Sequence, residues 1–168
     1  MTFVIIARQI DLSVASIIAV SSVVLGYTTS LGYDTWLVIS LTLLSGALCG
    51  AFNGAIITKF AIPSIIVTIG TMSLFRGLAY SFLEDSYYNK FPKIVSNLGS
   101  GYLFGYIPYA FLTFILLALV FAFILHKTTV GKKIFSIGNN PDAAQYTGIA
   151  VDKYTFVLFT LNLSLIHI

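Results

Sequence analysis

The chain has 168 residues, of which 58% are hydrophobic and only 9% are charged, with a formal net charge of +3. A soluble domain needs about a quarter of its residues charged to cover its surface, so this composition excludes an ordinary globular protein and indicates a membrane protein. The single cysteine excludes a disulfide framework and a metal site of the CxxC type. The first residues, MTFVIIARQI, have neither the basic region nor the small-residue cleavage site of a signal peptide.

Long uncharged segments predict an all-α fold, a polytopic transmembrane helical bundle. A helix needs about 20 mostly apolar residues to cross the hydrocarbon core of a bilayer, which gives about four to five spans here. The predicted helices lie near residues 12–30, 36–58, 63–83 and 108–126, and another begins near Tyr154. Residues 2–7 have the composition of the end of a preceding helix. We therefore treat residues 1–168 as a single transmembrane domain with two polar loops, 84–107 and 127–153.

The positions of lysine and arginine predict the orientation, because cytoplasmic loops carry an excess of both. If loop 127–153 is cytoplasmic, most basic residues fall on its side: Arg8, Lys59, Lys127, Lys132, Lys133 and Lys153. Lys90 and Lys93 fall outside, beside Asp34, Glu84 and Asp85. Aromatic residues typical of a membrane interface gather at the outer ends of the helices: Tyr27, Tyr33, Trp36, Tyr87, Tyr88, Tyr102, Tyr106 and Tyr109. We expect loop 127–153 to be cytoplasmic and loop 84–107 to be extracytoplasmic.

A stripe of small residues marks one face of the predicted helix 36–58. Gly46, Gly50 and Gly54 recur every four residues, a spacing that lets two helices approach closely in lipid. We favour helix packing within one subunit over a dimer interface. Asn53 lies beside the stripe and is expected to form a hydrogen bond with a neighbouring helix.

Two ionisable residues are candidates for function. Arg76 is a full charge inside a predicted span, which makes it a functional candidate, although its nearness to the outer end favours a structural or snorkelling role. Asp11 opens the run DLSVAS and is predicted to cap a helix by accepting the backbone N–H of Ser13 or Val14. The alternative is a broken helix whose exposed amides line a polar pathway. Asp11, Ser13, Asn53 and Arg76 are therefore the candidate residues of a translocation pathway.

Catalytic and cofactor motifs do not emerge from the sequence. His126 and His167 have no cysteine, carboxylate or serine at ligand or triad spacing, and no phosphate-binding GxxxxGK[ST] motif occurs. We predict no enzyme activity, no metal site and no cofactor. Any energy for transport must come from another subunit.

Loop 127–153 contains the residue pattern of a short capped helix, predicted over 141–147. Asn140 suits the N-cap and Pro141 the first helical position, while Asp142 meets the positive end of the helix dipole. Gly148 fits the position after the helix, where a left-handed backbone is common.

So short a helix is marginal alone and needs something to pack against. Ala143 and Ala144 would leave a smooth face that the backbone of another protein can approach. A docking helix and an incidental solvated loop helix both remain open on this ground.

Several stretches together resemble the membrane permease subunits of bacterial ABC importers, of the ribose/xylose/rhamnose/autoinducer-2 type. They are IDLSVAS at 10–16, NGAIITKFAIPSIIVTIGTMSLFRGLAY at 53–80, FPKIVSNLGSGYLFGYIP at 91–108 and TTVGKKIFSIGNNPDAAQYTGI at 128–149. The resemblance extends over almost the whole chain in the expected order.

The resemblance implies an importer in the bacterial inner membrane in which a second permease chain, the same or related, completes the pathway. Cytoplasmic ATPase subunits would drive it, and a periplasmic or surface-tethered binding protein would deliver a monosaccharide or related small polar solute. Membrane lipid surrounds such a subunit, and no nucleic acid is involved. The pattern DAAxxxG resembles the family's coupling-helix signature, which implies an ATPase contact at Asp142, Ala143, Ala144 and Gly148. The outer loop with Gly99, Gly101 and Gly105 is the expected docking surface for the binding protein.

The chain departs from the family's pattern in two respects. Arg8 and Gln9 stand where a pair of glycines is usual in the family. A basic residue at this place resembles some rhamnose-type members. Family members are also considerably longer, so we expect this chain to be a fragment, incomplete at both ends. The final LNLSLIHI is then either the end of a truncated gene or a tail that is not native.

Three functional alternatives remain. One is a branched-chain amino-acid permease of the same superfamily. Another is a channel or secondary transporter that works without an ATPase. The last is a membrane scaffold that transports nothing.

Overall fold

The computed structural model describes residues 1–168 except 84–87, 89–90, 104 and 166–168. The described chain is helical almost throughout, with one two-stranded antiparallel hairpin. In chain order the elements are α1 (Thr2–Ile6), α2 (Val14–Ser30), α3 (Thr35–Phe60), α4 (Ser64–Leu83), α5 (Lys93–Ser100), β1 (Tyr102–Leu103), β2 (Ile107–Pro108), α6 (Tyr109–Lys127), α7 (Thr129–Asn139), α8 (Pro141–Tyr146) and α9 (Val151–Leu165).

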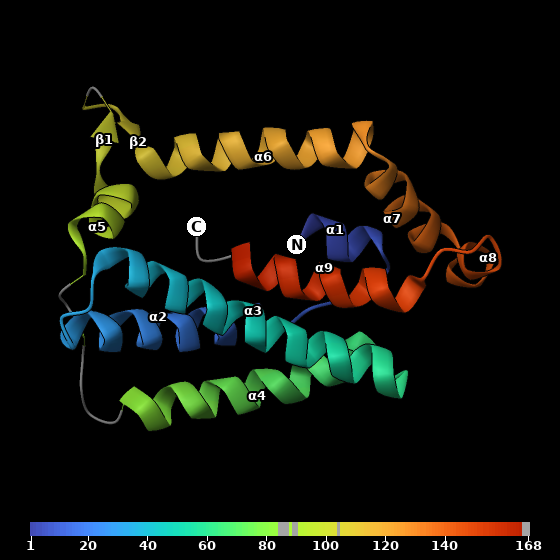
Figure 1. The fold of residues 1–168 in the computed structure, drawn as a ribbon, viewed down its shortest axis with the longest axis horizontal. Coiled ribbons are helices and arrows are strands. Elements are labelled where there is room, and N and C mark those ends of the chain that lie inside the picture. Colours follow the sequence, from blue (N-terminus) through green and yellow to red (C-terminus); the bar gives the residue numbers. More distant parts are fainter. Residues whose placement is uncertain (84–87, 89–90, 104, 166–168) are drawn as a thin grey trace.

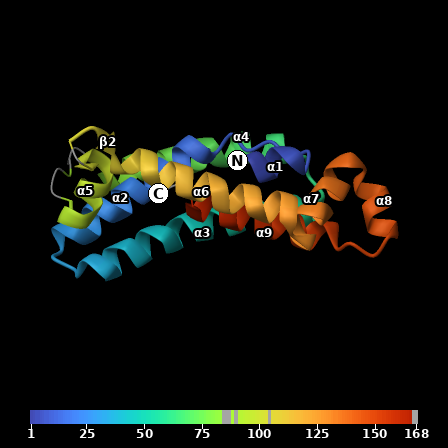
Figure 2. The ribbon, with the colours of Figure 1, turned by 90° about the horizontal axis from the view of Figure 1, so that it is seen from above.

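The long helices run side by side along the longest axis of the molecule (Figure 1). Helix α5 and the β1–β2 hairpin lie at one end, and α7 and α8 lie at the other. Seen from above, the bundle is narrow and elongated (Figure 2). The predicted all-α polytopic bundle is therefore confirmed. The described elements of the two polar loops lie at opposite ends of it, those of loop 84–107 at one end and those of loop 127–153 at the other.

Helix starts follow the prolines. A proline has no backbone N–H to donate, so it fits the first turn of a helix and disfavours its interior. All four prolines lie at the first residue of a helix or directly before it: Pro63, Pro92, Pro108 and Pro141. The N-cap of helix α3 is instead Asp34, whose carboxylate accepts the N–H of Trp36, and its C-cap is Ala61 in a left-handed conformation (φ +52°).

Three of the predicted spans are confirmed by length and composition. Helices α3, α4 and α6 are long and apolar enough to cross a membrane. The first predicted span is shorter than expected, because α2 begins at Val14 and has 17 residues. At about 1.5 Å per residue this is roughly 26 Å, less than the hydrocarbon core of about 30 Å. The last helix begins at Val151 rather than near Tyr154.

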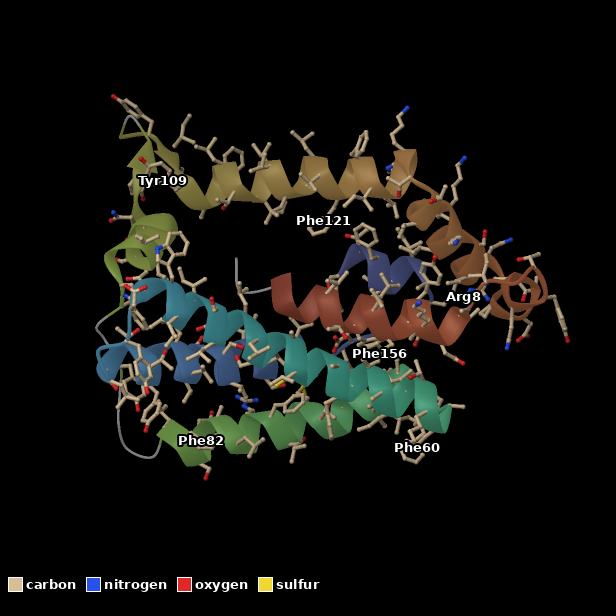
Figure 3. All side chains as sticks on the ribbon, viewed as in Figure 1. Arg8, Phe60, Phe82, Tyr109, Phe121 and Phe156 are labelled. Carbon is tan, nitrogen blue, oxygen red and sulfur yellow. The ribbon has the colours of Figure 1, made fainter. Side chains whose placement is uncertain are left out.

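Helix α3 holds the bundle together, with α2, α4 and α9 packed around it. One buried cluster joins four elements through Val4, Ile57, Val67 and Phe159. Helix α6 lies apart from this group, and its most apolar stretch is only 6% buried. It meets the rest of the bundle through an edge-to-face contact between Phe121 and Phe3, with ring centroids 5.4 Å apart (Figure 3).

Candidate functional sites

The chain is not helical between α1 and α2. Arg8 has a left-handed backbone (φ +58°), an uncommon conformation for a residue other than glycine. Helix α4 supports the break through two side chains: Ser64 Oγ accepts the N–H of Ile10 at 3.0 Å, and Thr68 Oγ1 donates to the Ile10 carbonyl at 3.3 Å. The helix break that the second alternative requires is therefore present, whereas a polar pathway lined by its amides stays a prediction.

Asp11 accepts the predicted hydrogen bond but does not occupy the predicted position. Its Oδ1 accepts the backbone N–H of Ser13 at 2.9 Å. The N-cap of α2 is nevertheless Ser13, two residues later. The prediction that Asp11 is the N-cap is therefore wrong by two residues, because residues 7–13 are not helical and α2 begins at Val14.

Asp11, Ser13 and Asn53 form one buried network, with residue exposures of 2%, 0% and 0%. Ser13 Oγ donates to Asp11 Oδ1 at 2.7 Å and accepts from Asn53 Nδ2 at 2.8 Å. The predicted bond from Asn53 to a neighbouring helix is therefore confirmed, with the start of α2 as its partner. These three candidates come together in space, and α3 and the break hold them.

Arg76 does not belong to this network. It lies on α4 and lines a cavity of about 500 Å³ between α2 and α4. The cavity is lined mostly by apolar residues, and four hydroxyl-bearing residues also line it: Ser16, Ser22, Tyr80 and Tyr88. Ser16 also connects the cavity to the break, since its Oγ donates to the Ser13 carbonyl at 2.7 Å.

A neighbouring cavity of about 450 Å³ is bounded by α2, α3 and α5. Ser22 and Phe91 line both this cavity and the one beside Arg76.

The predicted caps of α8 are confirmed. Asn140 Oδ1 accepts the N–H of Ala143 at 3.1 Å, and Pro141 is the first helical residue. At the other end, Gly148 adopts a left-handed conformation (φ +85°). Its N–H bonds to the Gln145 carbonyl, and the N–H of Ile149 bonds to the Ala144 carbonyl, which is the Schellman pattern.

The exposed face of α8 differs from the expected one. Ala144 is only 4% exposed and packs in a cluster with Ala7, Ile134 and Ile137. The expectation that Ala144 lies on an open face beside Ala143 is wrong, because α7 covers it. The accessible side chains are those of Asp142, Ala143, Gln145 and Tyr146, the last 91% exposed.

Helix α7 was missed by sequence reasoning, although its signals were present. Thr128 caps its start, and Ile134 and Ile137 recur at the spacing of one helix face. Two glycines allow close approach of other backbones. A Cβ at Gly138 would overlap the carbonyl oxygen of Ile6, and one at Gly131 would overlap that of Leu125. Helix α7 therefore joins α8 to α1 and to the end of α6.

The glycine stripe of α3 is buried at Gly46, Gly50 and Gly54. A Cβ on Gly54 would lie 3.2 Å from the Cα of Phe156, so α9 meets α3 at its backbone. Gly54 therefore serves helix packing within the subunit, as expected.

The two polar loops lie at opposite ends of the bundle. Arg8 and Phe60 lie toward the end formed by α7 and α8, while Phe82 and Tyr109 lie toward the opposite end (Figure 3). The predicted outer residues Glu84, Asp85, Tyr87 and Lys90 lie outside the described residues. Gly101, in the outer loop, is closely approached by the ring of Tyr109.

The comparisons with known proteins agree with this architecture. The family model described as "Branched-chain amino acid transport system / permease component" matches residues 1–162. The chain belongs to this family. The match includes the α1–α2 break, the cavity beside Arg76 and α8, so all the candidate sites lie within the family's own domain. With its apolar helices, the chain is thus a multi-pass membrane protein of a family of transport permeases.

Among curated proteins, the chain is similar to several that are named autoinducer 2 import system permease protein LsrC. The chain is 34% identical over 161 residues to that of Escherichia coli O9:H4 (strain HS), and the match covers 96% of this chain and 47% of the relative. The protein of Shigella flexneri is also 34% identical, and that of Photorhabdus luminescens is 33% identical with 48% of its length covered. The chain thus spans about half the length of the curated relatives it matches. No solved structure matches it.

Proposed function

We propose that this chain is the membrane-spanning permease part of an ATP-driven ABC importer in the bacterial inner membrane. Its solute would be a monosaccharide or a related small polar compound. The family and the relatives that import autoinducer 2 support this assignment. The observation that carries it is α8, a helix capped at both ends and held on α7, with its outer face open at the basic end of the bundle.

Helix α8 is the proposed docking site for a cytoplasmic ATPase. Asp142, Ala143 and Tyr146 would contact the ATPase, since their side chains are exposed. Ala144 would instead fix α8 on α7, and Gly148 would end the helix. This division of roles follows from burial, because a residue packed on its own chain cannot also face a partner.

The packing supplies a route from the docking site to the break. Ala144 contacts the α7 residues Ile134 and Ile137, whose cluster includes Ala7. Ala7 directly precedes the break, and α7 also approaches α1 through Gly138. Packed cores shift between discrete arrangements and do not deform continuously. A displacement of α8 by ATPase closure would therefore move α7 and α1 against α2, and so alter access to the cavity beside Arg76.

The remaining partners follow from the same assignment. A second permease chain would complete the pathway, and a binding protein would dock on the outer loop around Gly99, Gly101 and Gly105. The wide apolar surface of α6 is available for packing by further membrane helices.

Cysteine cross-linking tests the proposed ATPase contact in the full importer with its companion subunits. In a Cys49→Ser background, Tyr146→Cys should cross-link to the ATPase, because residue 146 lies at the tip of α8. Tyr106→Cys is the matched control, since Tyr106 is 89% exposed but lies in the β1–β2 hairpin at the opposite end. Equal cross-linking of both variants, or of neither, would contradict the proposal.

Solute uptake tests the energy source. Cells that express the complete system should accumulate labelled monosaccharide only while they contain ATP. Uptake that continues after ATP depletion would favour a channel or secondary transporter instead.

A branched-chain amino acid is the second candidate solute, and Arg76 is the observation that favours it. A guanidinium in the α2–α4 cavity could bind a carboxylate, which a sugar lacks. Competition for uptake separates the two candidates. Excess leucine should leave sugar uptake unchanged if the first assignment is right, and should abolish uptake of labelled leucine if the second is right.

A further inference from the structure

The break between α1 and α2 holds two buried oxygen atoms that have no hydrogen-bond partner in the described part of the chain. They are Asp11 Oδ2 and Asn53 Oδ1. Buried polar atoms are nearly always hydrogen-bonded, and an unpaired ionised carboxylate in an apolar interior costs far more than an unpaired amide. The two atoms belong to residues that share one partner, Ser13, so a single cause can account for both.

The hydrogen-bond pattern shows which atoms remain acceptors. The Ser13 hydroxyl has one hydrogen, which it donates to Asp11 Oδ1. Asn53 must therefore present its NH₂ group to Ser13, and its carbonyl oxygen stays unpaired. Asp11 Oδ1 already accepts two bonds, from the N–H and the O–H of Ser13. The carboxylate oxygen of Asp11 that has no hydrogen-bond donor is thus Oδ2.

Packing around the two atoms leaves no room for a water molecule. Each exposes less than 1 Å² of surface. A metal ion with several oxygen ligands needs space as well. A proton on the carboxyl group is the one donor that requires no added volume.

Charged groups on the surrounding elements do not supply the missing donor. These groups are the terminal ammonium of Met1, Arg8, Lys59, Arg76, Asp152 and Lys153. The ammonium of Met1 attracts Asp11 electrostatically, but it donates its hydrogen bond to Asn162 Oδ1. The others make no hydrogen bond to Asp11 Oδ2.

We propose that Asp11 is a proton-binding site: its Oδ2 carries a proton at neutral pH and donates it to Asn53 Oδ1. One hydrogen then satisfies both unpaired oxygens, and Oδ1 acts as the carbonyl-like acceptor for Ser13. The start of α2 is left polar and uncharged. This inference rests on the two unpaired oxygens and on the shared partner Ser13, and it is independent of the proposed solute and of the ATPase contact.

Infrared spectroscopy of the full-length protein in lipid tests the proposal directly. At neutral pH the wild-type protein should show the C=O band of a protonated carboxyl group, and Asp11→Asn should remove it. Asp142→Asn is the matched control, because Asp142 is exposed on α8, and it should leave the band in place. A wild-type spectrum without a protonated band that depends on Asp11 would overturn the proposal.

Asn53→Ala keeps the test decisive if Asp11→Asn does not fold. It should retain the protonated band but shift it to higher frequency, since the proton loses its acceptor, and an unshifted band would overturn the proposal.

If Asp11→Asn does fold, it should keep the melting temperature of the wild type, because its NH₂ group can make the same donation. Asp11→Leu, which has no donor, should lower that temperature.

A comparison of salts separates a proton from a metal ion. The melting temperature of the wild type should be the same in sodium chloride and choline chloride. A rise in sodium that Asp11→Asn abolishes would show a bound sodium ion and overturn the proposal.

Discussion

A Cβ atom on Gly54 would lie 3.2 Å from the Cα of Phe156, so helices α3 and α9 meet at their backbones. In lipid, helices gain little from hydrophobic burial and depend on such close packing. The contact fixes α9, the helix that follows α8, against the centre of the bundle.

Gly54→Val should therefore lower the stability of the bundle. The added methyl groups have to displace the backbone of α9, and such overpacking typically costs about 1–3 kcal/mol. Thermal unfolding of the purified protein in detergent measures the effect. Gly70→Val is the control for helix propensity, because a Cβ at Gly70 meets nothing within 4 Å. If both variants lose the same stability, the contact contributes nothing of its own.

Gly138→Ala should weaken the attachment of α7 to α1. Replacing a glycine inside a helix with alanine ordinarily stabilises the helix by about 1 kcal/mol. At Gly138 the new Cβ would overlap the carbonyl oxygen of Ile6, so we expect a loss of stability instead. Gly77→Ala, which meets nothing within 4 Å, should be neutral or stabilising. Unfolding in urea compares the two, and equal midpoints would refute the close approach.

Gly148→Ala should destabilise the end of α8 through the backbone alone. A Cβ at this position meets nothing within 4 Å, but the φ of +85° is unfavourable for alanine, at a cost of about 1–2 kcal/mol. Asparagine tolerates a left-handed conformation better, so Gly148→Asn should recover part of the loss. Protease sensitivity of loop 127–153 reports the local change. Identical cleavage rates for the alanine variant and the wild type would contradict the prediction.

Ser13→Ala should remove the centre of the buried network. Asn53 Nδ2 would lose its acceptor and Asp11 Oδ1 one of its donors. An unsatisfied buried polar group costs about 1–3 kcal/mol, and the melting temperature should fall accordingly. Ser30→Ala is matched in chemistry but removes only an exposed bond to the Tyr27 carbonyl. It should change the melting temperature little, and an equal fall in both variants would count against the network.

The helices and the ends of the bundle were predictable because their causes are local. A run of apolar residues long enough to cross a bilayer predicts α3, α4 and α6 whatever surrounds it. The caps of α8 were equally readable, since Asn140, Pro141 and Gly148 act on their own backbone. Helix α7 could have been found from Ile134 and Ile137, but the two lysines directly before them, Lys132 and Lys133, obscured the apolar face.

The sequence by itself determined the membrane class, the basic and aromatic ends, and the chemistry available at each candidate site. Only the tertiary structure decided which polar atoms meet. Asp11 and Asn53 are far apart in the chain, and the break after α1 brings both to Ser13. It also decided that Ala144 faces α7 and that Arg76 lies in a separate cavity. Capping and hydropathy depend on neighbours along the chain, whereas burial and pairing depend on how separate helices pack, which local residue patterns do not specify.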